Sequence, residues 1–169
     1  MSKRRLATIA VFAVLLAGVP ARAQQTAKQD GSTEAKERMA AEVDPVDRAK
    51  AFAKYGHGMI RDARDAAKGG DYERAEKVLT EYRDTLKRLH EALRARVSDP
   101  ERKPNGFKQL QIHVRKSLND IDDLVASVPA ALQPPFTFLR GEIDRLDRAL
   151  IDDLFPRKPN SRDPQKGKT

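Results

Sequence analysis

The sequence predicts an all-α domain, an antiparallel up-down four-helix bundle, from three observations. Four segments carry apolar residues at intervals of three and four, the spacing that lines one side of an α-helix. Clusters of Gly, Pro, Asp and Asn separate these segments. Each segment has a single apolar stripe, and helices joined by short or moderate loops bury such stripes against one another. The alternatives are a three-helix bundle with the first helix loosely attached, or a coiled-coil oligomer.

Residues 1–23 are predicted to be a cleavable signal peptide. Basic residues 3–5 precede an apolar run from Leu6 to Val19, and Ala21-Arg22-Ala23 has the small-x-small pattern that is cut before Gln24. The run is too short to span a membrane, which takes about 18 residues or more. We therefore expect an exported protein, periplasmic or extracellular, with no transmembrane segment after cleavage.

The charge divides unevenly along the chain. Removing the four basic residues of the signal from the total of 33 leaves 29 against 25 acidic residues, a net charge of +4. The stretch from Pro156 to Thr169 alone carries five basic residues and one acid, so the rest is nearly neutral. A nucleic-acid partner is therefore not expected. Residues 156–169 are predicted to be a disordered basic tail, with weak contact to an anionic surface as its alternative role.

Residues 24–43 form a polar leader that is expected to be disordered, with helical character near its end around Glu34 to Glu42. The helical bundle domain is expected over residues 44–155. With no cysteine in the chain, this domain has no disulfide and no thiolate metal site, and its core alone must stabilise it.

The first helix of this domain is expected from about Val46 to Lys68. Asp44-Pro45 supplies an N-cap acceptor followed by proline at the first helical position. Small residues on its stripe, including Gly56, suggest close approach to a neighbouring helix. Its predicted buried residues are Ala49, Phe52, Gly56, Met59, Ile60, Ala63 and Ala67.

The second helix is expected from Tyr72 to Val97, after the turn Gly69-Gly70-Asp71. So short a connection places two helices in antiparallel contact. Its predicted stripe is Tyr72, Ala75, Leu79, Tyr82, Leu86, Leu89, Leu93 and Val97. The string Gly70-Asp71-Tyr72-Glu73-Arg74-Ala75 resembles the turn of a tetratricopeptide hairpin, a family of peptide-binding helical repeats. The resemblance covers at most Arg48 to Leu93 and implies one hairpin, because no second copy follows.

The third helix is expected from about Phe107 to Val128, where Pro129 closes it, and the fourth from roughly Phe136 to Leu154. The third stripe comprises Phe107, Leu110, Val114, Leu118, Ile121, Leu124, Val125 and Val128; the fourth comprises Phe136, Leu139, Ile143, Leu146, Leu150 and Leu154. The string from Gly106 to Lys116 and the ending Leu154-Phe155-Pro156 are similar to exported bacterial helical proteins of unassigned function, a resemblance that implies no activity.

Three histidines, His57, His90 and His113, are the candidates for a metal or cofactor site, because helical bundles house such groups between facing helices. None belongs to a pair spaced to place two ligands on one helix face. We therefore expect them to be partly exposed helix residues. The acidic clusters Asp120 to Asp123 and Asp152-Asp153 are expected to be solvated.

No nucleophile elbow, phosphate-binding glycine loop or His-Glu-x-x-His motif occurs in the sequence. The sequence therefore predicts no catalytic, metal or cofactor residue, and the chain is expected not to be an enzyme. The predicted function is an interaction or scaffolding protein of the bacterial cell envelope, with a protein partner. The alternative is a small metal- or cofactor-binding bundle that uses the three histidines.

Overall fold

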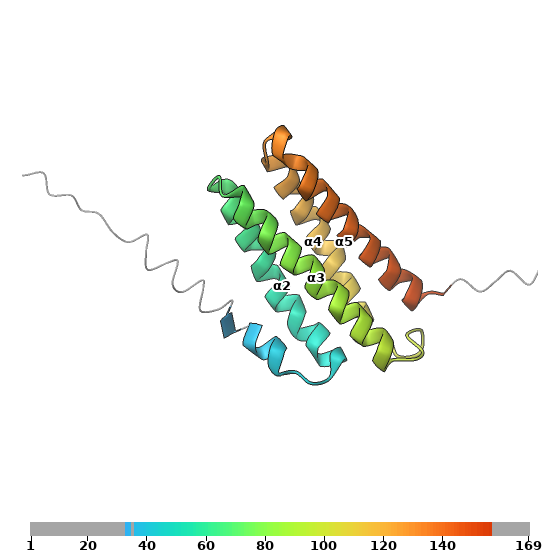
Figure 1. Cartoon of the computed structure of the whole chain (residues 1–169). Coiled ribbons are helices and arrows are strands. Elements are labelled where there is room, and N and C mark those ends of the chain that lie inside the picture. Colours follow the sequence, from blue (N-terminus) through green and yellow to red (C-terminus); the bar gives the residue numbers. More distant parts are fainter. Residues whose placement is uncertain (1–32, 35, 157–169) are drawn as a thin grey trace, which may run out of the picture.

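The computed structural model describes residues 33, 34 and 36–156, and this part of the chain is all-helical. Four long helices pack together: α2 (Pro45–Lys68), α3 (Tyr72–Arg96), α4 (Phe107–Ser127) and α5 (Gln133–Leu154), with a short 3-10 turn, η1 (Ala130–Leu132), before α5 (Figure 1). The four predicted helices are thus confirmed, and their ends agree to within three residues. The predicted signal peptide, residues 24–32 and 35 of the predicted leader, and all but the first residue of the predicted tail lie outside the described residues.

The four helices share one core. α2 contacts α3 and α4, and α5 contacts the same two helices, so the contacts close a ring. α2 contributes Phe52, Met59 and Ile60 to the core, each at most 4% exposed. The alternative with a loosely attached first helix is therefore wrong.

The predicted stripes are buried, with three exceptions. Tyr72, Val125 and Leu146 are only partly buried, although each packs against the core. On α5 the fully buried position next to Leu146 belongs to Asp147. The spacing of three and four residues thus located the buried sides of all four helices, but a charged residue occupies one place in the core.

Local capping explains where α2 and α3 begin. The Asp44 side chain accepts a hydrogen bond from the Val46 backbone N–H at 2.8 Å, and Asp71 accepts one from Arg74 at 3.1 Å. Both aspartates satisfy backbone donors that have no partner within the helix. Gly70 has φ +79° in the turn between these helices, a conformation that glycine adopts without steric cost.

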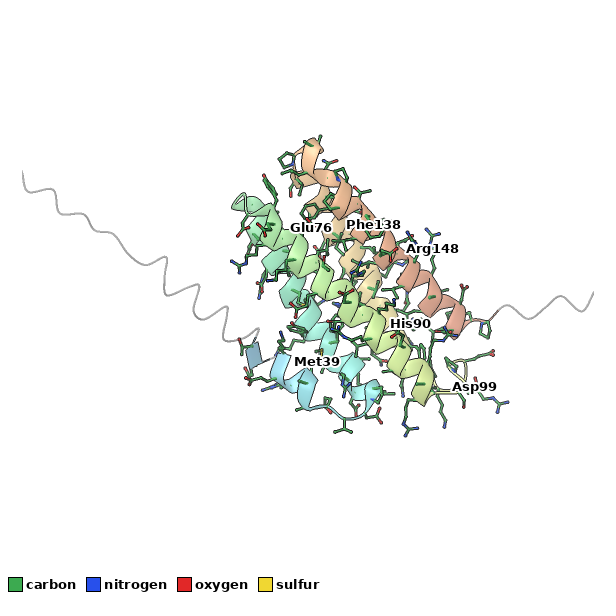
Figure 2. The ribbon with its side chains drawn as sticks, in the orientation of Figure 1. Met39, Glu76, His90, Asp99, Phe138 and Arg148 are labelled. Carbon is green, nitrogen blue, oxygen red and sulfur yellow. The ribbon has the colours of Figure 1, made fainter. Side chains whose placement is uncertain are left out.

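A short leader helix, residues 33, 34 and 36–41, lies before α2 (Figure 1). It coincides with the end of the polar leader, where helical character was expected. Met39, labelled in Figure 2, packs against the core, and Lys36 Nζ lies 3.2 Å from Glu81 Oε1 on α3. The leader helix is therefore attached by one half-buried apolar side chain and an exposed ion pair.

Candidate functional site

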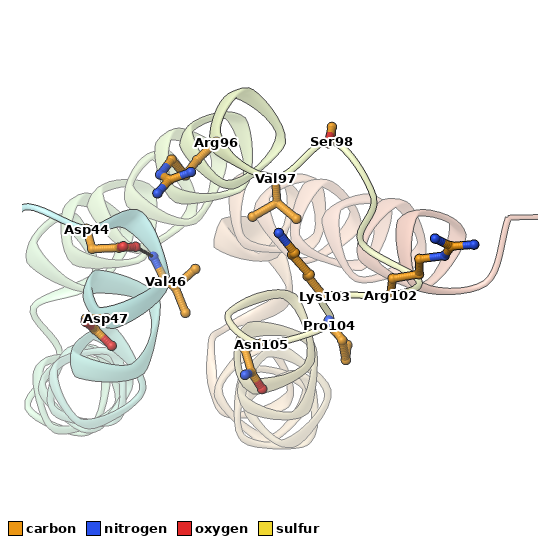
Figure 3. A pocket seen from close by; sticks show the side chains of 10 residues that line it. All are labelled: Asp44, Val46, Asp47, Arg96, Val97, Ser98, Arg102, Lys103, Pro104 and Asn105. Atoms are coloured by element: carbon orange, nitrogen blue, oxygen red, sulfur yellow. Dashed lines mark hydrogen bonds between the residues drawn. The ribbon is translucent and has the colours of Figure 1, made fainter.

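A cleft of about 510 Å³ opens at the end of the molecule where α2 begins and α3 ends; we call it the base cleft (Figure 3). This volume falls within the range of typical ligand sites. Three segments build it: the first turn of α2, the last turn of α3, and the loop that leads into α4. The lining residues are Asp44, Val46, Asp47, Arg96, Val97, Ser98, Arg102, Lys103, Pro104 and Asn105.

Gly106 holds the loop of the base cleft in place. Its φ is +86°, and its N–H donates to the Gln109 side chain at 2.7 Å. A Cβ at this position would lie 2.7 Å from Leu93 Cδ2 and 3.3 Å from Val46 Cα. The loop therefore approaches both α3 and α2 so closely that only glycine fits, which fixes the cleft between them.

Charges of both signs line the base cleft. Asp44 and Asp47 lie at the start of α2, Arg96 lies at the end of α3 on the same side of the view as Asp44, and the Lys103 side chain reaches from the loop toward Val97 (Figure 3). Asp44 caps α2 and Asp47 pairs with Lys50 at 2.7 Å. Over residues 33, 34 and 36–156, neither Arg96 nor Lys103 has a carboxylate within ion-pair distance.

Three apolar residues also line the base cleft. Val97 is 9% exposed, and Val46 and Pro104 are half-buried. The lining therefore offers apolar contact as well as charges of both signs to a ligand.

The exposure of two of the three histidines differs from the sequence-based prediction. His57 is exposed, as expected, but His113 is 3% exposed and His90 is 6% exposed. Both were predicted to be partly exposed helix residues. They are core residues, because each lies three or four positions from other buried residues on its helix.

His113 is the centre of a buried polar cluster. Its Nε2 lies 3.1 Å from the Tyr82 hydroxyl on α3, and its ring meets those of His57 and Phe52 edge to face, with centroids 4.9 and 5.4 Å apart. Burial, and secondarily the nearby His57, lowers the pKa of His113 to about 4. Burial raises the pKa of Tyr82. Both groups are therefore neutral at pH 7.

Gly56 makes room for the His113 ring. A Cβ at Gly56 would lie 2.5 Å from His113 Nε2 and 3.1 Å from Phe52 Cε1. The close helix approach that the small residues of α2 suggested is therefore present here. The imidazole lies directly against the α2 backbone.

His90 has a different partner. Its Nε2 lies 2.6 Å from Asp153 Oδ2 on α5, and Arg94 lies 3.6 Å from the other carboxylate oxygen. The Asp153 side chain is only 18% exposed, so the prediction of a solvated pair is wrong for this residue. Of the other cluster, Asp120 pairs with Arg64 on α2 and Asp122 with Arg140 on α5. These acids join helices instead of forming a reactive pair.

Asp147 is a charged core residue that the sequence-based prediction missed. Its side chain is 1% exposed, with Arg115 Nη2 2.7 Å from Oδ2, although not aligned as a hydrogen bond, and Gln111 donating to Oδ1 at 3.1 Å. The signal was present, because Asp147 lies four residues after Ile143 and three before Leu150. The missed residues of the base cleft carried no comparable periodicity, because they come from helix ends and a loop.

The structure does not bring the three histidines together. His57 and His113 are adjacent, whereas His90 pairs with Asp153. Within the described part of the chain, no group of three or more His, Cys, Asp or Glu residues is placed to hold a metal ion.

No family model, curated protein or solved structure matches this chain. Among the described helices, none combines the length and the apolar character needed to cross a bilayer.

Proposed function

We propose that this chain is an exported, non-enzymatic helical interaction or scaffolding protein of the bacterial cell envelope, and that its base cleft binds a segment of a partner protein. The observation that carries the proposal is the base cleft, whose lining combines charges of both signs with three apolar residues. The first 23 residues, with their basic start, apolar run and small-x-small site, support export. The basic tail adds weak, salt-sensitive contact with anionic surfaces of the envelope.

The proposed architecture is an antiparallel up-down four-helix bundle. The three residues between α2 and α3 support antiparallel packing of that pair. The ring of contacts, in which α2 and α5 each touch α3 and α4, supports a square arrangement with the longer α3–α4 loop crossing its end. This arrangement gathers the start of α2, the end of α3 and the loop at one end, where the base cleft lies.

The charges of the base cleft define the partner segment. Arg96 and Lys103 are cations without a carboxylate partner in the described chain, so they are available to an acidic group of the ligand. The carboxylates of Asp44 and Asp47 at the start of α2 suit a basic group. Val46, Val97 and Pro104 supply apolar contact. We therefore infer an extended partner segment that carries an acidic, a basic and an apolar residue.

Exposed charges contribute modestly to affinity and more strongly to specificity and association rate. The contact is therefore expected to be weak and sensitive to salt. Several such weak contacts that act together would give a scaffold a higher overall affinity for its partner.

The test is photo-crosslinking in the envelope of the source cell. A photoreactive residue replaces Asn105 in the cleft or, as the control, Asn119, which is exposed on α4. A defined partner band is expected from position 105 only. The double charge reversal Arg96→Glu/Lys103→Glu should reduce that band at least about tenfold, which corresponds to about 1.4 kcal/mol.

A matched double reversal, Lys108→Glu/Lys116→Glu, changes the net charge equally at two exposed lysines outside the cleft. It should leave the band unchanged. Equal bands from positions 105 and 119, or equal losses in the two double variants, would refute the base cleft as the binding site.

A further inference from the structure

We propose that His113 is an acid-operated latch: protonation of its buried imidazole releases α2 from α4 and exposes the apolar core between them. The inference is independent of the partner and concerns how the fold responds to pH. An exported protein is exposed to the acidity of its surroundings, so such a response would have a use in the proposed location.

The geometry leaves no acceptor for a second imidazole proton. His113 Nε2 is hydrogen-bonded to the Tyr82 hydroxyl, and Nδ1 of the same ring is buried with no hydrogen-bond partner. A neutral imidazole carries one N–H, whereas the protonated ring carries two donors. Protonation would therefore place an unsatisfied donor and a net charge in the core, both of which are costly.

The surrounding groups do not compensate that charge. From α2 the ring meets the imidazole of His57, and from α3 it meets the Tyr82 hydroxyl. On α4 itself, Asp120 is engaged by Arg64, and on α5 the buried Asp147 is engaged by Arg115 and Gln111. Within residues 33, 34 and 36–156, no carboxylate lies within ion-pair distance of His113.

We expect protonation to weaken mainly the contact between the His113 ring and α2. The ring lies against the α2 backbone at Gly56, while α4 is tied to α5 through Asp147. Much of the buried side of α2 consists of alanine, which provides little apolar area per residue; these residues are Ala49, Ala63, Ala66 and Ala67. A groove of about 360 Å³ on the α2–α4 surface is lined by His57 and Ile60 and by the Arg64–Asp120 ion pair, which joins the two helices at the surface.

The sign of the pH dependence follows from the two pKa values. In the closed protein the pKa of His113 is lowered to about 4 by burial, whereas an exposed histidine has a pKa near 6.5. The open state therefore binds the proton more tightly. The closed state is fully favoured above pH 6.5 and loses stability as the pH falls through 4, and the closed-to-open equilibrium constant decreases by roughly 300-fold in total once the pH is well below 4.

The experiment uses the mature chain, residues 24–169, and follows the His113 imidazole by NMR between pH 7 and 3. Amide hydrogen exchange, corrected for the intrinsic effect of pH, reports the opening. The ring is expected to stay neutral well below pH 6.5, and α2 amides should lose protection at a higher pH than α5 amides. Titration of His113 near pH 6.5 in the folded chain, or simultaneous loss in α2 and α5, would overturn the proposal.

The matched variants are His113→Gln and His57→Gln. The amide of glutamine at 113 can donate to or accept from the Tyr82 hydroxyl but takes up no proton in this range, so the acid-induced loss of α2 protection should largely disappear. His57→Gln changes only the exposed neighbour and should retain the opening. If His113→Gln opens at the same pH as the unaltered chain, His113 is not the latch; if that variant does not fold at pH 7, the NMR titration of the unaltered chain still decides.

Discussion

Gly56 and His113 show how a single hydrogen atom in place of a side chain allows a polar ring into the core. Glycine inside a helix costs about 1 kcal/mol relative to alanine. Here that cost is offset by the packing of the imidazole against the α2 backbone, where a Cβ would come within 2.5 Å of Nε2. The residue that weakens the isolated helix therefore belongs to the tertiary contact.

Gly56→Ala is expected to destabilise the protein by about 1–2 kcal/mol, because the clash with a ring fixed by Tyr82 and Phe52 exceeds the gain in helix propensity. Urea unfolding followed by circular dichroism measures the change. The matched control is Gly141→Ala on α5, where nothing lies within 4 Å of the added Cβ. That substitution should stabilise by up to about 1 kcal/mol, and equal effects of the two would contradict the assigned role of Gly56.

At the scale of the element, the contact between α4 and α5 includes a buried carboxylate with a largely exposed partner. The Asp147 side chain is 1% exposed, whereas Arg115 is 58% exposed. A buried ion pair frequently contributes less than a well-packed apolar residue, but removal of one partner leaves the other charge uncompensated. Substitutions of Asp147 and of Arg115 should therefore change the free energy of unfolding in opposite directions.

Arg115→Met is expected to destabilise by about 1–2 kcal/mol, less than for a fully buried partner because water partly replaces the guanidinium. Asp147→Leu, which removes the buried charge and retains similar volume, should be close to neutral or stabilising. Unfolding of both variants at pH 7 in the same denaturant series checks the contrast. A larger loss for Asp147→Leu than for Arg115→Met would show that the ion pair itself stabilises α5 on α4.

The helices themselves were largely predictable, and the polar core was not. Asp44-Pro45, Gly69-Gly70-Asp71 and Pro129 are local signals, since the capping group and the peptide it serves are close in sequence. Burial of Asp147 and His113 depends on which helices face each other across the core. Their spacing with apolar neighbours was visible in the sequence, but polarity made a solvated position the simpler interpretation.

At the scale of the whole molecule, helices α2 to α5 form the core among themselves, and the leader helix packs on its outside. Met39 is half-buried, the Lys36–Glu81 pair is exposed, and Arg48 donates two hydrogen bonds to the Glu42 carbonyl oxygen. Each of these contacts is individually weak. The domain should therefore remain folded when this helix is removed.

A chain that begins at Asp44 is expected to fold with a loss of about 1–2 kcal/mol relative to the chain that begins at Gln24, mainly because Met39 no longer covers apolar surface. Thermal unfolding of the two chains measures the difference. Lys36→Gln in the longer chain separates the ion pair from the apolar contact and should cost at most about 1 kcal/mol. Failure of the shorter chain to fold would show that the leader helix is an integral part of the core.

The sequence by itself determined the class of fold, the four helices and the sides that they bury. Those properties arise from capping, proline geometry and three-to-four spacing, which act over a few neighbouring residues. Only the tertiary structure decided that His113 fits against Gly56, that Asp147 is buried beside Arg115, and that Arg96, Lys103 and Asp44 line one cleft. Each of these depends on segments far apart in the chain, and their meeting is set by the packing of whole helices, which no local pattern records.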